Sequence, residues 1–425
     1  MEIQKYKKRE YLQQKEPLQK KDKPIPQKKL KLIYKEQSPI KVYNPPYDSS
    51  WFETENKLSL SNYINQLYSI SEKYLKYNVN PDTIKGIFVP HSGIRYSGLC
   101  SASAYSHLNG RKYPIKRIIL LCTNHNLGNE SALGFISTTY TNISSYHSNN
   151  NNNNNTQQSL NIDTKSLNKL KPHLHFNDKL FQEEHSFYNQ LPFIESITPR
   201  ASKLLILPFL ISNNINLLDK SIANNIRVVI TYLIELLKNK DTIIICTSDL
   251  SHINGHFQHK ISSNIFNNIR KQDNEIIQFL YDGVNGVNKR SQKIDDILFI
   301  QNAPSCGTLA IYFFAKILNN VYGKITCESS SGVCDGISKS SSSSSDEKSP
   351  IVNKKFNLSS ITKYKFKYTV SSKLHPKLAC YYTSLMRDKI DIMKFNPSQL
   401  NTILEIKDMT QSSISYAGII FTYQK

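Results

Sequence analysis

The sequence predicts an α/β fold: a single domain with a central mixed β-sheet flanked by helices. Short runs rich in Ile, Leu and Val alternate along the chain with longer stretches whose apolar residues recur at helical spacing. Several of the apolar runs end in a histidine or an aspartate, as strands of open α/β sheets do where they lead into a binding site. The sequence contains no evident internal repeat. One layered domain is therefore the architecture we expect.

The predicted elements begin with a helix over residues 58–77, where Leu60, Ile64 and Leu67 lie on one helical face. An apolar strand then ends at Val89, and a turn that contains two glycines leads into a second helix. The remaining strands are predicted at 117–122, 204–210, 242–246 and 412–421, and the remaining helices at 222–237, 260–281 and 308–318.

Composition divides the chain into a basic tail, residues 1–42, and one α/β domain, residues 43–425. The first forty residues hold 12 Lys and Arg against 5 Asp and Glu and have no sustained apolar period, which predicts a disordered tail. Within the domain, a run of asparagines and a run of serines predict disordered inserts near residues 146–160 and 328–352.

Charge and cysteine content narrow the class of protein. The formal net charge of +21 would suit a polyanionic partner, but the chain lacks an RNP, zinc-finger or helix-turn-helix signature, so we expect no specific nucleic acid partner. No run approaches the roughly 18 apolar residues of a membrane span, so no transmembrane segment is expected. Seven scattered cysteines, without a CxxC pair or a signal region, predict reduced thiols in the cytoplasm or nucleus and argue against a structural zinc site.

Four polar side chains follow predicted strands, and a cysteine opens a predicted helix. The four are His91, His125, Asp249 and His252, and the cysteine is Cys306. If the strands are neighbours, these side chains converge on one edge of the sheet, where imidazoles and a thiolate suit iron, copper or zinc. Asp249 would then orient a ligand histidine. The helix N-terminus would favour the thiolate of Cys306.

Each of these residues also has a purely structural interpretation. Cys306 could be a small buried side chain, which is the more common case for a free cysteine, and Asp249 could be a cap. His185, which follows two glutamates, fits an ordinary surface histidine. The recurrence of the pattern at several strand ends supports a metal site, although spacing alone leaves the structural interpretations more common.

The motifs resemble those of the Memo family (mediator of cell motility). Val89–Gly98 is similar to the family motif PHAGYxYSG. Further blocks match the family in the same order: Cys122–His125, Glu184–Ser186 with Leu191–Phe193, Ser248–His252, Cys306–Gly307 and Ser412–Ala417. Together the blocks span about residues 43 to 425, apart from the inserts.

The resemblance implies a fold like that of class III extradiol dioxygenases, whose iron is held by two histidines and a glutamate. In the Memo family a cysteine takes the third place. Carried over to this chain, the metal ligands would be His91, His125 and Cys306, and the metal would be copper or iron. Asp249 and His252 would line the same pocket, with His185 nearby, and these three are the candidates for catalysis.

The resemblance also implies partners and a role. Memo proteins link receptor signalling to the cytoskeleton and cell migration, and phosphotyrosine peptides have been proposed to bind at the pocket. This chain departs from the family at Asp48 and Gln190, where the family has histidines, and at Thr123–Asn124. Because the three implied metal ligands are retained, the lost histidines bear more on peptide binding than on metal binding.

Three hypotheses follow. In the first, the protein binds metal and acts in signalling or in redox and metal handling, without dioxygenase activity. In the second, it is an oxidoreductase that uses O₂, with His252 or His185 as general base; Cys306 in place of glutamate argues against ordinary ring cleavage because a thiolate is softer and oxidisable. In the third, it is a phosphopeptide-binding adaptor, for which Arg95 is the one obvious cation.

Overall fold

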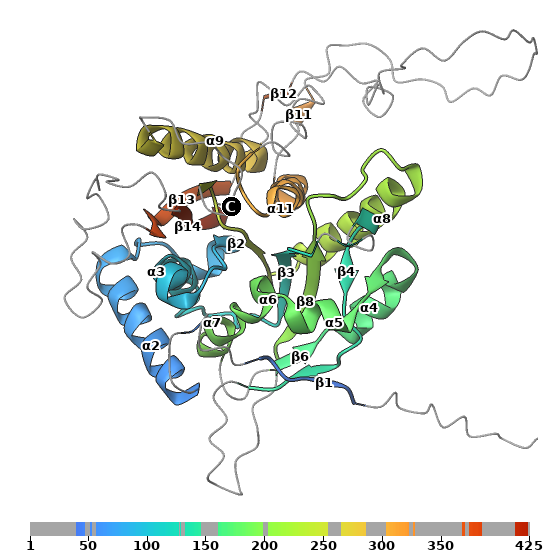
Figure 1. The fold of residues 1–425 in the computed structure, drawn as a ribbon, viewed down its shortest axis with the longest axis horizontal. Helices are drawn as coiled ribbons and strands as arrows, with labels where there is room; N and C mark the ends of the chain where they lie inside the picture. The colour runs from blue at the N-terminus through green and yellow to red at the C-terminus, as the bar shows by residue number, and fades with distance from the viewer. Residues whose placement is uncertain are drawn as a thin grey trace, which may run out of the picture. The chain divides into compact units, whose positions relative to one another are not determined.

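Four parallel strands form the centre of the sheet in the computed structural model. They are β2 (Ile84–Val89), β3 (Arg117–Thr123), β8 (Leu205–Ile211) and β9 (Thr242–Thr247), and they are hydrogen-bonded in the order β8-β3-β9-β2. Almost every residue in them is buried, as expected of parallel strands covered on both faces. Their continuous apolar runs follow from that burial. Figure 1 shows β3 and β8 at the middle of the fold, with β2 farther along the sheet.

The structure describes residues 40–46, 52, 57–126, 128, 132–145, 160–198, 203–253, 265–285, 303–322, 326–327, 368–369, 374–384 and 413–423. All of them belong to one compact unit, Ile40–Lys425, and most of their buried apolar side chains form one hydrophobic core cluster. The predicted tail up to residue 39 and most of the two predicted inserts lie outside the described residues. Among the residues described, no helix combines the length and the apolar character needed to cross a membrane.

Antiparallel strands extend the sheet beyond β2, which makes it mixed, as predicted. The long strand β14 (Ser413–Tyr423) pairs with β2 on one side, and with β13 (Leu374–Thr383) and the short β10 (His252–Ile253). Beyond β8 the sheet continues with β6 (Leu160–Ile162), β5 (Asn142–Ile143) and β1 (Val42–Tyr43), while β4 (Ile136–Ser137) pairs with β8 and β7 (His175–Phe176). A separate pair joins β11 (Thr326–Cys327) and β12 (Tyr368–Thr369).

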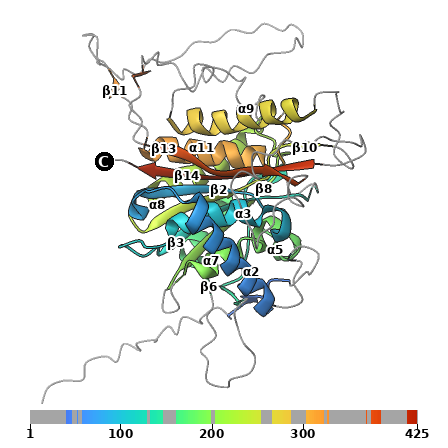
Figure 2. The same ribbon diagram turned by 90° about the vertical axis from the view of Figure 1, so that its left-hand side faces the viewer.

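Helices cover both faces of the sheet, which confirms the predicted α/β class. In Figure 2, α9 (Ile265–Asn285) and α11 (Thr308–Tyr322) lie above β13 and β14, whereas α2 (Lys57–Ile70), α3 (Ile94–Tyr105) and α7 (Leu191–Ser196) lie below. The remaining helices are α4 (Thr164–Leu170), α5 (Asp178–Glu183), α6 (His185–Tyr188) and α8 (Lys220–Leu237), with single turns at 71–75, 81–83, 106–108 and 171–173.

The first helix differs from the sequence prediction at its C-terminal end. The prediction was one helix over 58–77, but α2 ends at Ile70 and a π-helical turn, Ser71–Leu75, follows. Ser71 Oγ donates a hydrogen bond to the carbonyl of Leu67 at 2.8 Å. A serine that bonds back to the preceding turn competes with the regular helical pattern, which accounts for the change of pitch.

Helix α3 lies close against β14 because of a glycine. A Cβ added at Gly418 would lie 2.3 Å from the carbonyl oxygen of Cys100 in α3. Only a residue without a side chain permits this approach of helix backbone to strand. The contact fixes α3, and with it the loop before α3 that carries His91.

Candidate metal centre

The candidate site is formed where three neighbouring parallel strands end. Strand β9 lies between β3 and β2, so the residues that follow these strands meet at one edge of the sheet. His91 lies two residues after β2, His125 two residues after β3, and Asp249 two residues after β9. The structure thus brings these side chains together, and Cys306, just before α11, joins them.

His91 is buried and is held at both ring nitrogens. Its Nδ1 lies 3.1 Å from Thr247 Oγ1, and its Nε2 lies 3.2 Å from Cys306 Sγ. The backbone is fixed as well, since His91 N donates to Asp249 Oδ1 at 2.9 Å and Asn189 Nδ2 donates to the carbonyl of His91 at 2.8 Å. The ring is therefore pre-oriented with Nε2 toward the thiol.

His125 is held by Glu184 at the solvent-facing side of the site. Its Nδ1 lies 2.9 Å from Glu184 Oε1, and its backbone N–H donates to Glu184 Oε2 at 2.8 Å. The ring stacks on that of His185 with centroids 4.4 Å apart. The His125 side chain is 34% exposed whereas that of His91 is 0% exposed, so solvent reaches the cluster from the His125 side.

The residue that follows Cys306 has no room for a side chain. A Cβ at Gly307 would lie 2.2 Å from Thr123 Oγ1 and 2.7 Å from Ser248 Oγ, so glycine lets the chain pass against the ends of β3 and β9. The Sγ accepts a hydrogen bond from the backbone N–H of Asp249 at 3.3 Å. Helix α11 itself begins at Thr308, as predicted, so Cys306 stands two residues before the helix.

The histidines around Cys306 favour its thiolate. Burial alone would raise the pKa of Cys306, but the charge of His91 and hydrogen bonds from the surrounding imidazoles outweigh it and hold the pKa well below its usual value. Burial would lower the pKa of His91, yet the Cys306 thiolate and Asp249 raise it. The pair is thus stabilised in its charged form when no metal is bound.

The outer part of the site contains a second charge pair. Burial opposes ionisation of Glu184, but its hydrogen bond with His125 and the neighbouring imidazoles lower its pKa to about 2. Burial would lower the pKa of His125, but the hydrogen bonds with Cys306 and Glu184 hold it well above its usual value. Burial and the positive charge of His125 lower the pKa of His185 to about 3, so His185 is neutral near pH 7.

The three predicted candidates for catalysis also lie at this edge. Asp249 Oδ2 is 4.0 Å from His91 Nε2 and 4.0 Å from His252 Nε2, and it accepts a hydrogen bond from Ser92 Oγ at 2.5 Å. Asp249 therefore holds mainly the loop that carries His91, rather than the ring of His91. His185 lies with its Nδ1 3.4 Å from Glu184 Oε1.

Two overlapping groups of potential metal ligands result. Among the described residues, the ligand atoms of His91, His125 and His185 lie within 4.8 Å of one another, and so do those of His91, Asp249 and Cys306. His91 belongs to both groups. In the second group His91 and Cys306 provide imidazole and thiolate, a donor pair that suits copper, iron or zinc. The trio that the sequence motifs imply, His91, His125 and Cys306, coincides with neither group.

Sequence reasoning missed the residues that hold the ligands in place. Glu184, Thr247 and Asn189 are buried and bond to the two histidines, but none was predicted as a site residue. For Glu184 a signal was present, because it stands directly before His185 in one of the matched motifs. Thr247 and Asn189 carry no local signal, since their contacts with His91 span 156 and 98 residues of the chain.

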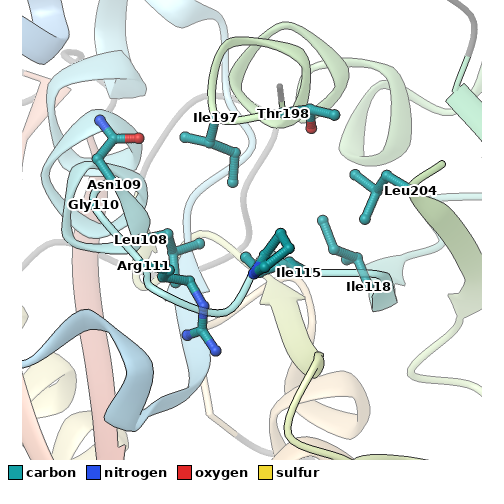
Figure 3. Close-up of a pocket in the computed structure, with 10 residues that line it drawn as sticks. Leu108, Asn109, Gly110, Arg111, Ile115, Ile118, Ile197, Thr198 and Leu204 are labelled. Atoms are coloured by element: carbon teal, nitrogen blue, oxygen red, sulfur yellow. The ribbon is translucent and has the colours of Figure 1, made fainter. Parts of the chain in front are cut away.

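A separate cavity lies toward the opposite end of β3. It has a volume of about 130 Å³ and is lined mostly by apolar side chains, among them Ile115, Ile118 and Leu204, with Arg111 beside them (Figure 3). Ile118 is the second residue of β3, whereas His125 follows its last residue, so this cavity is no part of the candidate site. The guanidinium of Arg111 donates to the carbonyls of Pro81 and Ile84, which gives it a structural role.

A sequence model of the family described as Memo-like protein matches residues 49–346. The chain belongs to the Memo-like family. It is 28% identical over 169 residues to a MEMO1 family protein of Sulfolobus acidocaldarius, an alignment that covers 40% of this chain and 53% of that relative. The chain thus spans about half the length of the curated relative it matches.

The positions at which this Memo-like chain departs from the family motif can now be placed. Gln190 is buried, where it donates to the carbonyl of Pro90 at 3.1 Å and accepts from Tyr105 at 3.2 Å, so it supports the strand that leads to His91. Thr123 Oγ1 donates to the carbonyl of Thr247 at 2.9 Å and ties β3 to β9. Asp48 lies outside the described residues.

Proposed function

We propose that this Memo-like protein binds one copper or iron ion through His91, His125 and Cys306. The observation that carries the proposal is the contact of 3.2 Å between His91 Nε2 and Cys306 Sγ, beside a thiol whose pKa is held well below its usual value. The thiolate is the protonation state that a metal requires of a cysteine, whereas the imidazoles, whose pKa values are raised, would lose their protons as the ion binds.

The residues that hydrogen-bond to the proposed ligands have distinct roles in this proposal. Glu184 holds the Nδ1 side of His125, and Thr247 holds that of His91, which leaves the Nε2 atoms for the ion. Asp249 fixes the backbone at His91 and donates its own N–H to Cys306. Bound copper or iron would supply redox and Lewis-acid chemistry at this edge of the sheet.

The biological role that we propose is in the cytoplasm or nucleus, either in signalling to the cytoskeleton and cell motility or in redox and metal handling. It rests on membership of the Memo-like family and on the resemblance of the sequence motifs. Signalling proteins with phosphotyrosine would be the partners, and they would approach the exposed edge formed by His125. Arg95 stands at the start of α3, directly after the loop of His91.

A second candidate is a metal-dependent oxidoreductase related to extradiol dioxygenases. The one-third exposure of His125 favours it, because a substrate needs an open approach to the metal. His252, His185 and Asp249 are the candidates for proton transfer in this case. The pKa of about 3 makes His185 a weak base, so His252 beside Asp249 is the stronger candidate.

The metal content of the purified protein tests whether it binds metal at all. The protein is purified without a metal-affinity step, exposed to Cu(I) or Fe(II) without oxygen, dialysed and analysed for metal. We expect about one ion per chain, and loss of most of it in Cys306→Ser and His91→Ala. His173→Ala is the matched control, because His173 bonds to Asn225 of α8, outside the site.

The proposal fails if the wild-type protein takes up neither metal. If it does bind metal, oxygen consumption by the loaded protein distinguishes an oxidoreductase from a binding protein. Binding of a phosphotyrosine peptide to the metal-free protein would instead favour the adaptor.

A further inference from the structure

Helix α9 carries a carboxylate in the middle of its buried face. Ile269, Asp273, Ile276 and Leu280 recur at the spacing of one helical face, and all four are buried. An apolar side chain is the ordinary occupant of such a position. A fully buried carboxylate is costly unless hydrogen bonds compensate for the loss of water, so Asp273 calls for an explanation.

Asp273 is hydrogen-bonded to two other parts of the fold. Its Oδ1 accepts the backbone N–H of Ser251 at 2.9 Å, and its Oδ2 accepts the hydroxyl of Tyr381 in β13 at 2.7 Å. Burial raises the pKa of Asp273, and the hydrogen bonds from Ser251 and Tyr381 offset this only in part. The carboxylate thus connects α9 to the segment that follows β9.

Ser251 belongs to the segment that contacts Cys306. Ser251 forms a β-bridge with Ser305, and His252 N donates to the carbonyl of Pro304 at 3.1 Å. Ser305 Oγ in turn donates to the carbonyl of Asp249 at 2.6 Å. Two segments, 248–252 and 304–306, are therefore paired side by side, and Asp273 holds the first from the side of α9.

We propose that Asp273 is a positioning residue of the candidate metal centre. It acts through Ser251: by accepting that N–H it fixes segment 248–252, which fixes Asp249 and, through the bridge to Ser305, the place of Cys306. The effect on metal binding rests on the proposed function, whereas the effect on the segment itself does not.

The test replaces the carboxylate by a side chain that suits the buried face. Asp273→Leu keeps an apolar stripe on α9 but removes the acceptor for Ser251. Asp273→Asn retains a carbonyl oxygen that can accept the same N–H. Ile269→Ala is the matched control, because it weakens the packing of the same helix one turn away without touching Ser251.

The first measurement is hydrogen exchange of the metal-free protein in peptides that cover residues 248–252. We expect exchange at least about tenfold faster in Asp273→Leu, and near wild-type exchange in Asp273→Asn and in Ile269→Ala. The second measurement is metal affinity, which should fall by about tenfold or more in Asp273→Leu and recover in Asp273→Asn. Asp273→Ala serves in place of the leucine variant if that variant does not fold.

The proposal is overturned if residues 248–252 exchange at the same rate in Asp273→Leu as in the wild type. It is also overturned if Ile269→Ala accelerates exchange as much as Asp273→Leu does, because the packing of the helix would then be the only cause. If the wild-type protein binds no metal, the exchange data still decide whether Asp273 holds the segment. Failure of the metal proposal and failure of this inference are therefore distinguishable.

Discussion

Gly307 lets Cys306 lie against the ends of β3 and β9, and the space for a side chain at this position is already occupied. An alanine Cβ would meet Thr123 Oγ1 at 2.2 Å and Ser248 Oγ at 2.7 Å. Both hydroxyls are fixed by hydrogen bonds, Thr123 to the carbonyl of Thr247 and Ser248 to Ser305. Neither hydroxyl can rotate away without losing a buried contact.

We predict that Gly307→Ala destabilises the protein by about 1–3 kcal/mol, the usual range for overpacking a buried site. Urea denaturation measures the change. The double variant Thr123→Ala/Gly307→Ala should be less destabilised than the sum of the single changes, because the nearest obstructing atom is gone. Simple additivity of the two changes would contradict the steric explanation.

At the same scale, the sequence predicted the residues at strand ends better than the residues that hold them in place through hydrogen bonds. His91, His125 and Asp249 could be proposed because each follows an apolar run, and parallel neighbouring strands bring such positions together. Thr247 and Asp273 could not, because their importance depends on contacts with segments distant in sequence. The catalytic and ligand roles assigned from the sequence stay predictions.

Among the elements, α11 depends on a residue from the loop after β8. Asn213 Oδ1 accepts the backbone N–H of Leu309 in the first turn of α11 at 3.1 Å, and its Nδ2 donates to the carbonyl of Cys306 at 2.8 Å. One side chain thus caps the helix and holds the backbone of the candidate ligand.

Two substitutions at Asn213 separate its role as a helix cap from its hydrogen bond to Cys306. Asn213→Ala should cost about 1 kcal/mol of stability, the usual cost of a lost cap, and should also weaken metal binding. Asn213→Asp keeps an acceptor for Leu309 but, when ionised, has no donor for the carbonyl of Cys306, so it should retain more stability than the alanine variant while metal binding still weakens. Thermal unfolding and metal titration measure the two effects. Wild-type metal affinity in both variants would show that the bond to Cys306 does not matter.

The start of α5 is joined to two neighbouring segments by Asp178. Its carboxylate accepts from Thr138 Oγ1 at 2.5 Å and from the backbone N–H of Thr139 at 2.7 Å, and it pairs with Lys41, just before β1. Burial would raise the pKa of Asp178, but the hydrogen bonds from Lys41 and the two threonines lower it.

A lowered pKa means that the folded state favours the carboxylate. The stabilisation is therefore complete above the usual pKa of 3.8 and is lost as the pH falls through the lower value in the folded protein. We predict that Asp178→Asn costs about 1 kcal/mol near pH 6, most of it from the threonine hydrogen bonds, since an ion pair with the half-exposed Lys41 adds little. The difference from wild type should shrink below pH 3.8 in urea titrations. A difference that stays constant down to the acid limit would exclude the charge as its cause.

At the scale of the whole molecule, the sheet has a covered centre, and two of its outermost strands are very short. The central strands β3, β9 and β2 are buried and lie between helices, whereas β1 and β10 have only two residues each. We predict that amides of the central strands exchange with solvent only when the whole domain unfolds, and that those of β1 and β10 exchange through local opening. Hydrogen exchange with mass spectrometry tests this. Exchange in β3 as fast as in β1 would contradict it.

The predicted α/β class and family are confirmed, because both rest on features that the sequence records directly: long apolar runs, helical spacing and short motifs. The order of the strands could not be read in the same way. Nothing local to β9 indicates that it lies between β3 and β2, or that β14, more than 300 residues after β2, pairs with it. Strand order is decided by pairing across the whole chain.

The separation of His91 and Cys306 has a consequence for how the protein matures. The two contacting residues lie 215 positions apart in the chain, so their pairing contributes to a high contact order. At ordinary rates of translation, roughly 10 to 40 s pass between the synthesis of the two residues. During that interval His91 and His125 emerge without the thiol, and a copper ion that met them would find an incomplete ligand set. Under the proposed function, metal would therefore be loaded after folding, when all three ligands are in place, rather than on the nascent chain.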